Sequence, residues 1–391
     1  MRTNIKVFFT LTILAIVYWF LFDFLRWEQF DTPSFIGGAR LLFGLDGGYD
    51  FQSRLTKPLI LILPGFIEFI TYVHPKYVFI FQNVIFFYLS GFYIYKIIQL
   101  IFKDDKTAYL GMLVYVTCQP FAIYSLFVLS DVAGWFFGIF TIYLTLKYFS
   151  KQIVQLKHLV LIGFIIGLGC LAKESAIIGL IFLFSYILFN AFSLKEKFMQ
   201  FLISFIGFIV PFVISFFLIE YFYNDNVFKR INVVYKLFEH DSFELSNLKQ
   251  IFRIIDMYWV IFIIGMVTVV KILKKQPHNI ALKSIIFTGI ITSILIPIWP
   301  CFTDRILFLI APILIIIVVY GINKFKQFAF SLVLIGGFLN IFISFIIYKF
   351  KINGAIVIGT IIFLIVTAIF ALILNKNNIL KILNKKRIKI K

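Results

Sequence analysis

The sequence predicts an all-α membrane protein, a polytopic bundle of about twelve transmembrane helices with both chain ends on the cytoplasmic side. Hydrophobic residues make up 62% of the 391 residues and charged residues only 14%, against about 45–50% and about 25% in soluble domains. A soluble core of this size does not absorb that much apolar surface, so lipid must cover much of the protein. Two further observations are a series of long apolar segments and an uneven distribution of charge between them.

A spanning helix needs about 20 mostly apolar residues. Twelve segments of the sequence meet this requirement, at 6–25, 77–101, 108–127, 131–149, 158–173, 175–192, 199–222, 253–273, 284–302, 306–322, 327–348 and 355–375. The segment 58–72 is also apolar, but it is short, and Pro58, Pro64 and Pro75 punctuate it. We expect this segment to form an interfacial or re-entrant helix that does not span.

Charge supports this topology. With the N-terminus inside, the inner segments and the tail 376–391 hold most of the Lys and Arg residues, but only three of the 18 acidic residues (Asp104, Asp105 and Glu196). This is the asymmetry of the positive-inside rule. It accounts for the net charge of +19 without nucleic acid, so we expect membrane lipids and no nucleic acid as partners. The predicted location is a bacterial inner membrane, with the basic tail held against anionic lipid heads.

The predicted organisation is one transmembrane domain, residues 1–375, followed by the cytoplasmic tail. Two outer loops are long, at 26–76 and 223–252, and the other connections are short. Function must therefore lie in these loops, at the outer helix ends, or in a cavity between helices. The second loop either helps to choose a substrate or forms a solvated cap.

Charged side chains of the first outer loop are the first candidates, because ionisable groups near hydrocarbon are costly. Asp31 lies just beyond the first span, with Glu28 nearby, and precedes a short amphipathic segment that ends at Gly44. Asp31 either faces a lipid-borne substrate or caps this segment as a helix. Arg54 and Lys57 are cations on the same rim, which either bind phosphate or extend toward the interface from an apolar surface.

Further candidates lie at three predicted outer turns. Asp131 begins the fourth span, where Ser130-Asp131 is also a helix-capping pair. Lys173 and Glu174 interrupt a long uncharged stretch, either as part of a site or as a self-neutralising ion pair. Arg305 marks a late outer turn.

Together these pieces resemble the GT-C superfamily of polytopic glycosyltransferases, which includes protein mannosyltransferases and bacterial aminoarabinose transferases. The resemblance covers roughly residues 1–322. Those families have an acidic residue early in a long first outer loop, as at Asp31, followed by a small-residue helix like Gly37–Leu42. They carry a Lys-Pro-Pro-Leu motif further on, which here is Lys57-Pro58-Leu59 with one Pro missing.

The later motifs are similar as well. A second acidic residue stands at the outer turn after the third span, like Asp131, and a Gly-rich helix ends in a Lys, like 163–173. An Arg with a Pro seven residues on follows late in the core, as with Arg305 and Pro312. The chain departs from the pattern in having one acidic residue, Asp31, where others have an acidic pair, and in lacking the large C-terminal outer domain of some members.

The resemblance implies a glycosyltransferase whose donor is a sugar on a polyisoprenyl phosphate. An acceptor on a lipid, a glycan or a protein would attack the anomeric carbon with inversion. Asp31 would take the acceptor proton, and Asp131 would position the acceptor. The leaving phosphate would be stabilised by cations. The candidates are Lys57, Arg54, Lys173 and Arg305, with Glu28 and Glu174 in support.

No cofactor follows from these motifs alone. If a divalent cation takes part, the carboxylates of Asp31 and Asp131 favour Mg or Mn. The alternative functions are a transporter or flippase of lipid-linked glycans, a glycan polymerase, and a structural membrane protein. The glycosyltransferase hypothesis predicts that one outward-facing cavity is lined by Asp31, Asp131, Lys57, Lys173 and Arg305.

Overall fold

The computed structural model describes residues 2–25, 31–46, 52–150, 155–223, 279–296, 305, 308–322 and 327–350. Within these ranges every regular element is a helix, so the predicted all-α fold class is confirmed. Five helices are long and apolar enough to cross a membrane, at 3–22, 75–102, 131–149, 194–221 and 329–346. Five shorter apolar helices accompany them. The protein is an integral membrane protein.

The α-helices are α1 (Arg2–Phe22), α2 (Thr32–Leu42), α3 (Pro58–Thr71), α4 (Pro75–Phe102), α5 (Asp105–Val116), α6 (Gln119–Tyr124), α7 (Asp131–Phe149), α8 (Leu156–Ala172), α9 (Ile178–Phe189), α10 (Leu194–Tyr223), α13 (Ile280–Leu295), α15 (Ala311–Ile322) and α16 (Gln327–Phe350). Short 3-10 helices are η1 (Gln52–Thr56), η2 (Glu174–Ile177) and η5 (Phe308–Ile310).

The predicted spans coincide with helices within a few residues wherever the structure describes them, with one exception. The predicted spans 253–273 and 355–375, the tail and nearly all of the second outer loop lie outside the described residues. The count of twelve spans is therefore not confirmed. The short segment 58–72 does form a helix, α3, of 14 residues. At about 1.5 Å per residue this is about 21 Å, which is too short for a hydrocarbon core of about 30 Å.

The exception is the predicted span 108–127, which is wrong as one continuous helix. α5 ends at Val116, and α6 begins at Gln119 after a break at Thr117 and Cys118. Pro120 explains the break, because it lacks the backbone N–H that a helix interior needs but fits the first turn of a new helix. The chain leaves α6 without helical structure and enters α7 at Asp131.

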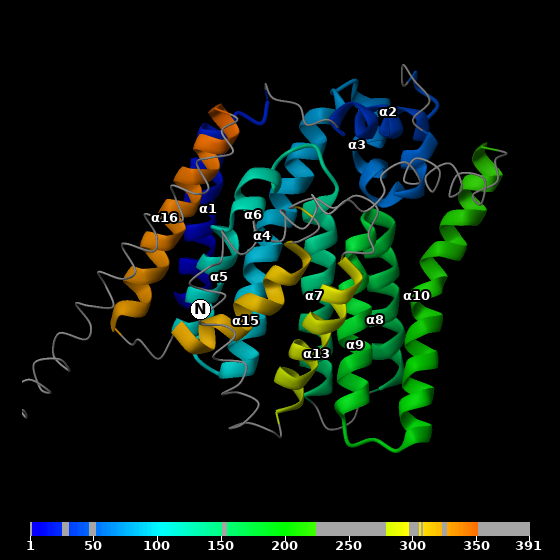
Figure 1. The fold of residues 1–391 in the computed structure, drawn as a ribbon. Coiled ribbons are helices and arrows are strands. Elements are labelled where there is room, and N and C mark those ends of the chain that lie inside the picture. Colours follow the sequence, from blue (N-terminus) through cyan, green and yellow to red (C-terminus); the bar gives the residue numbers. More distant parts are fainter. Residues whose placement is uncertain are drawn as a thin grey trace, which may run out of the picture.

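The helices pack side by side (Figure 1). α4 packs against α5 and α7, α7 against α8 and α9, and α8 against α10. α13 packs against α9, while α15 and α16 pack against α5. Figure 1 shows α2 and α3 gathered over one end of this bundle, away from the N-terminus. We call α2, η1 and α3 the cover; it contacts the bundle through α4 and α8.

Two features hold the cover together. A Cβ atom at Gly65 of α3 would lie 2.3 Å from the backbone oxygen of Ala39 in α2, so only glycine permits this close approach. One helix turn away, the guanidinium of Arg40 pairs with both carboxylate oxygens of Glu68 at 2.8–3.1 Å. The fork geometry of such a pair fixes the orientation of the two helices as well as their distance.

The opposite end of the bundle carries its own polar contacts. The Thr3 hydroxyl donates to Asp105 at 3.1 Å, and the Lys96 ammonium donates to Asn4 at 3.2 Å. The start of α1 and the turn between α4 and α5 therefore share one end, as the alternating topology requires. The cover lies at the other end.

Candidate active site

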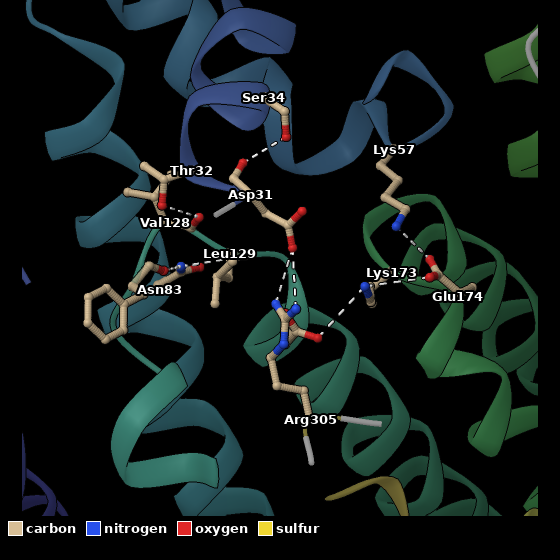
Figure 2. Close-up of polar contacts among 12 residues, drawn as sticks. Asp31, Thr32, Ser34, Lys57, Asn83, Val128, Leu129, Lys173, Glu174 and Arg305 are labelled. Atoms are coloured by element: carbon tan, nitrogen blue, oxygen red, sulfur yellow. Dashed lines mark hydrogen bonds and ion pairs between the residues drawn. The ribbon is translucent and has the colours of Figure 1, made fainter. Parts of the chain in front are cut away.

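Seven charged side chains form a continuous series of ion pairs beneath the cover. Figure 2 shows five of them directed toward one another. They are Asp31 at the start of α2, Lys57 before α3, Lys173 and Glu174 at the turn between α8 and η2, and Arg305. We call this set the charged series. In order, its members are Arg54, Asp31, Arg305, Asp131, Lys173, Glu174 and Lys57.

Asp31 binds two arginines. It occupies the N-cap position of α2, but its side chain makes no capping hydrogen bond. Its Oδ1 accepts from Arg54 at 2.8 Å and its Oδ2 accepts from Arg305 at 3.3 Å. The Ser34 hydroxyl donates to the Asp31 backbone oxygen and accepts from Arg54 Nε. The capping alternative is therefore wrong for the carboxylate, which is directed at the cations of the charged series.

Arg305 bridges the two aspartates. Besides Asp31, its Nη1 donates to Asp131 Oδ2 at 3.2 Å, and its guanidinium lies 5.6 Å from the ring centre of Tyr124. Asp131 is only 3% exposed and stands in the first turn of α7. The helix dipole favours a carboxylate there. Ser130, at the N-cap position, makes no side-chain capping bond.

The second half of the charged series runs through Lys173. Its ammonium lies 3.7 Å from Asp131 and 3.5 Å from Glu174. Glu174 in turn lies 2.9 Å from the Lys57 ammonium. Lys173 and Glu174 do pair with each other, but each has a second partner, so a self-neutralising pair does not describe them. Lys57 likewise contacts a carboxylate of the site and is not simply extended toward the interface.

Gly134 makes the approach of Lys173 to Asp131 possible. It lies one turn after Asp131 on α7, and a Cβ atom there would come within 2.7 Å of Lys173 Cβ and 2.2 Å of Ser175 Oγ. Contacts this short do not occur between real side chains, so any larger residue would displace the backbone that carries Lys173. The glycine therefore sets how closely the two charges meet.

The charges shift one another's proton affinity. Burial lowers the pKa of the Lys57 ammonium to about 8; Glu174 opposes this shift, and Lys173 and Arg54 add to it. Burial alone would raise the pKa of the Asp31 carboxyl, but the nearby Arg54 and Arg305 outweigh it and hold that pKa below its usual range. Asp31 is thus ionised at neutral pH, and Lys57 is mostly protonated.

These residues do not fit a divalent metal ion in the arrangement described. A shared Mg or Mn would occupy the space between the carboxylates of Asp31 and Asp131. The guanidinium of Arg305 already lies there, within 3.3 Å of one carboxylate and 3.2 Å of the other. Among the described residues no three His, Cys, Asp or Glu side chains converge as ligands. We therefore derive no step through a metal.

Two cavities with mostly apolar walls flank the charged series in the described part of the chain. The smaller, of about 230 Å³, lies between α9 and α13 and is lined by Lys173, Glu174, Ser175 and Thr292 among aliphatic side chains. The larger, of about 610 Å³, lies between the cover and the helices α8 and α10. Its walls include Leu42, Pro58, Leu59, Leu168, Pro211 and Ile214.

The structure brings together all but one of the residues that the sequence singled out. The exception, Glu28, lies outside the described residues. Sequence reasoning missed Asn83, which is buried in α4 and bonded to the chain just before Asp131. Its signal was visible: Gln82-Asn83 is a polar pair inside a long apolar segment, where such groups need partners.

Part of the chain matches a known protein family. Residues 58–216 match the model of the dolichyl-phosphate-mannose-protein mannosyltransferase family. This segment begins at Pro58, the residue after Lys57, and contains the whole of α7 and the turn at Lys173 and Glu174. No curated protein sequence matches the chain significantly.

Solved structures show the same fold at low sequence identity. ArnT from Cupriavidus metallidurans, bound to undecaprenyl phosphate, superposes with a TM-score of 0.65 at 11% identity, over 93% of this chain and 75% of that chain. An oligosaccharyltransferase from Archaeoglobus fulgidus, in complex with Zn and sulfate, gives a TM-score of 0.52 at 12% identity, over 90% and 52%.

The archaeal oligosaccharyltransferase AglB of Archaeoglobus fulgidus, in complex with an inhibitory peptide and a dolichol-phosphate, also gives 0.52, at 13% identity over 92% and 55%. The chain spans about half the length of these two oligosaccharyltransferase chains. Together, the family match and the shared fold confirm the resemblance of this chain to the GT-C superfamily and support a membrane glycosyltransferase of that type.

Proposed function

We propose that this protein transfers a sugar from a polyisoprenyl phosphate to an acceptor on the outer face of the membrane, with inversion at the anomeric carbon. The observation that carries the proposal is the charged series: four cations and three carboxylates in mutual contact, beneath the cover and beside apolar cavities. Burial of a charge costs several kcal/mol per ion, which pairing with an opposite charge offsets. The charged series has one more cation than carboxylates, and a substrate phosphate would neutralise this surplus.

The cations account for departure of the phosphate. In the transfer, the bond between the anomeric carbon and the phosphate oxygen breaks, and its electron pair stays on that oxygen. Preorganised cations stabilise charge that develops in this way, most strongly where water is scarce. Lys57, Lys173, Arg54 and Arg305 carry this role in the proposal, since all four have side chains that are no more than 22% exposed.

Asp31 is the proposed base. The acceptor oxygen or nitrogen forms the new bond from the face opposite the phosphate, and its proton passes to the Asp31 carboxylate. Both Asp31 oxygens are paired with arginines before substrate enters. A donor phosphate competes for the same guanidinium groups, so its binding would free one carboxylate oxygen and raise its basicity. Asp131, held by Arg305 and Lys173, would orient the acceptor.

The larger cavity suits the lipid tail of the donor. It begins at Pro58 and Leu59, directly after Lys57, and continues along α8 and α10. A phosphate at Lys57 would thus have an apolar channel beside it, and burial of a hydrocarbon chain there contributes about 25 cal/mol per Å². ArnT is bound to undecaprenyl phosphate and AglB to a dolichol-phosphate in the matching structures, which supports a lipid of this class.

The outer-face assignment rests on the positive-inside asymmetry and on the position of the site. The cover lies at the end of the bundle opposite the start of α1 (Figure 1), and Asp31 of the charged series stands at the start of its helix α2. We propose that the start of α1 is cytoplasmic. A transporter would place ionisable groups near the midplane, on broken helices. Here the charges lie at helix ends: α2 and α7 begin beside Asp31 and Asp131, and α8 ends beside Lys173.

The experiment uses purified protein in proteoliposomes with radiolabelled sugars on undecaprenyl phosphate. Lipid, glycan and protein fractions of bacterial envelopes serve as acceptors. We expect loss of label from the donor and its appearance in one acceptor fraction, with the configuration at the anomeric carbon inverted. Movement of intact donor across the bilayer without cleavage would contradict the proposal and support a flippase instead.

A further inference from the structure

The segment Phe127–Leu129 connects α6 to α7 without helical structure. All three residues are buried, with exposures of 1%, 2% and 1%. Backbone carbonyls in such a place have no water and must find partners in the protein. The Phe127 ring packs 4.7 Å from Phe24, between centroids, at the end of the first span. This segment is therefore fixed in the protein interior, two residues before Asp131.

Side chains from two other elements satisfy the carbonyls of this segment. The amide nitrogen of Asn83, which is 1% exposed in α4, donates to the backbone oxygen of Phe127 and, at 3.1 Å, to that of Leu129. The Thr32 hydroxyl, also 1% exposed, donates to the oxygen of Val128 at 3.4 Å. Figure 2 shows these contacts beside Asp31.

These bonds connect the two aspartates of the charged series. Asp31 is the residue before Thr32, so the Thr32–Val128 bond ties the start of α2 to the segment. Only Ser130 separates the segment from Asp131, so the Asn83 bonds set where α7 begins. Arg305 reaches both carboxylates, at 3.3 and 3.2 Å, only while their separation is kept.

We propose that Asn83 is a positioning residue, which sets the spacing of Asp31 and Asp131 by holding the segment Phe127–Leu129 against α4. It touches no substrate in this account. The inference rests on the proposed function for its effect on catalysis, but the structural role can be measured without any activity.

The matched pair of variants is Asn83→Leu and Gln82→Leu. Each replaces a buried polar side chain of α4 by an apolar one of similar size. Gln82 is 7% exposed, and its Oε1 has no hydrogen-bond partner in the described part of the chain. Asn83→Leu leaves the Leu129 carbonyl without the Asn83 donor and the Phe127 carbonyl with only the backbone N–H of Leu129, at 2.8 Å, whereas Gln82→Leu leaves these bonds intact. Thr32→Val, which keeps the side-chain shape, tests the other tie and remains available if Asn83→Leu does not fold.

Two measurements separate positioning from general stability. The first is kinetic, on the monodisperse protein in nanodiscs: a displacement of about 1 Å in a reacting group lowers kcat on the order of 100-fold. We expect a fall of this order for Asn83→Leu. We also expect a much smaller loss of affinity for undecaprenyl phosphate without sugar, because Lys57 pairs with Glu174 and this pair does not depend on the segment. Gln82→Leu should behave like the wild type in both assays.

The second measurement is hydrogen exchange of peptides that cover 31–37 and 126–135. We expect faster exchange in both peptides for Asn83→Leu and Thr32→Val, and in neither for Gln82→Leu. Equal exchange and equal kcat in Asn83→Leu and Gln82→Leu would overturn the positioning role. So would a parallel loss of kcat and phosphate affinity in Asn83→Leu. If the wild type transfers no sugar while the exchange pattern is as expected, the proposed function fails and the structural tie stands.

Discussion

At the end of the bundle where α1 begins, Asp105 is exposed and takes hydrogen bonds from the neutral side chains of Thr3 and Gln99. Beneath the cover, Asp131 is 3% exposed and faces two cations, Arg305 and Lys173. An exposed carboxylate stays in contact with water, so hydrogen bonds of the first kind add little net stability. Buried charges of the second kind carry a desolvation cost of several kcal/mol per ion. The comparison supports the proposal that the end beneath the cover is the site of the chemistry, while the polar contacts at the other end join neighbouring helices.

The largest expected effect contrasts the two ends directly. Asp31→Asn removes the proposed base while keeping the shape of the side chain, and we expect kcat to fall on the order of 10²–10⁴-fold. Asp105→Asn, the same substitution at the opposite end, should leave kcat within about twofold, because Asp105 is exposed and far from the charged series, and substitutions at such sites have small effects. Sugar transfer from the undecaprenyl-phosphate donor measures both. Unimpaired transfer by Asp31→Asn would remove Asp31 from the role of base.

The pH dependence of donor binding tests the proposed role of Lys57 as a cation of the site. Lys57 has its pKa lowered to about 8, so it is protonated below that pH and neutral above it. We expect kcat/KM for the donor, which reports the free enzyme, to fall by up to about tenfold per pH unit above 8. Lys57→Arg should move this limb to higher pH, because a guanidinium stays charged. An unchanged limb in that variant would mean that another group titrates.

A pair of glycines on α7 tests how closely the charges must meet. A Cβ at Gly134 would lie 2.7 Å from Lys173 Cβ and 2.2 Å from Ser175 Oγ, whereas one at Gly138 would lie 2.6 Å from Ile178 Cγ2, which belongs to no charged residue. We expect Gly134→Ala to lower kcat/KM about tenfold, or by about 1.4 kcal/mol, and Gly138→Ala to change it far less. Both substitutions improve helix propensity by about 1 kcal/mol, so melting temperatures measured alongside separate lost activity from lost stability. Equal activity in both variants would contradict the prediction.

The smallest expected effect concerns metal ions. Because Arg305 lies between Asp31 and Asp131, we expect a chelator such as EDTA to change the transfer rate by less than about twofold, in contrast with sites where a metal clamps the phosphate. The measurement is transfer after dialysis against chelator, with added Mg or Mn as the control. Loss of activity that Mn restores would show that substrate binding rearranges this bridge.

Sequence reasoning went furthest with the helices and with the charged residues. Long apolar segments leave a helix as the only way to satisfy the backbone in lipid, so α4, α7 and α10 were predictable. Charges at the ends of such segments are few, and each is conspicuous. The break between α5 and α6 was missed because the residues around Pro120 are as apolar as those of a continuous span.

The partners within the site were not predictable from the sequence. Asp31 was an even choice between a helix cap and a functional group, because both uses place an acid before the same segment. Only the packing of the cover decided it, by directing Arg54 and Arg305 at its two oxygens. In the sequence, Asn83 is likewise only a polar residue within a predicted span. The structure shows its partner, the segment Phe127–Leu129.

The sequence by itself thus determined that this chain is an α-helical membrane protein and which charged residues stand at its helix ends, because hydrophobicity and charge act locally along the chain. Tertiary structure alone decided that Arg305 joins Asp31 to Asp131 across residues far apart in sequence, and that Lys57 meets Glu174. Those contacts depend on helix packing and on the close approach permitted by Gly134 and Gly65, which no local pattern encodes.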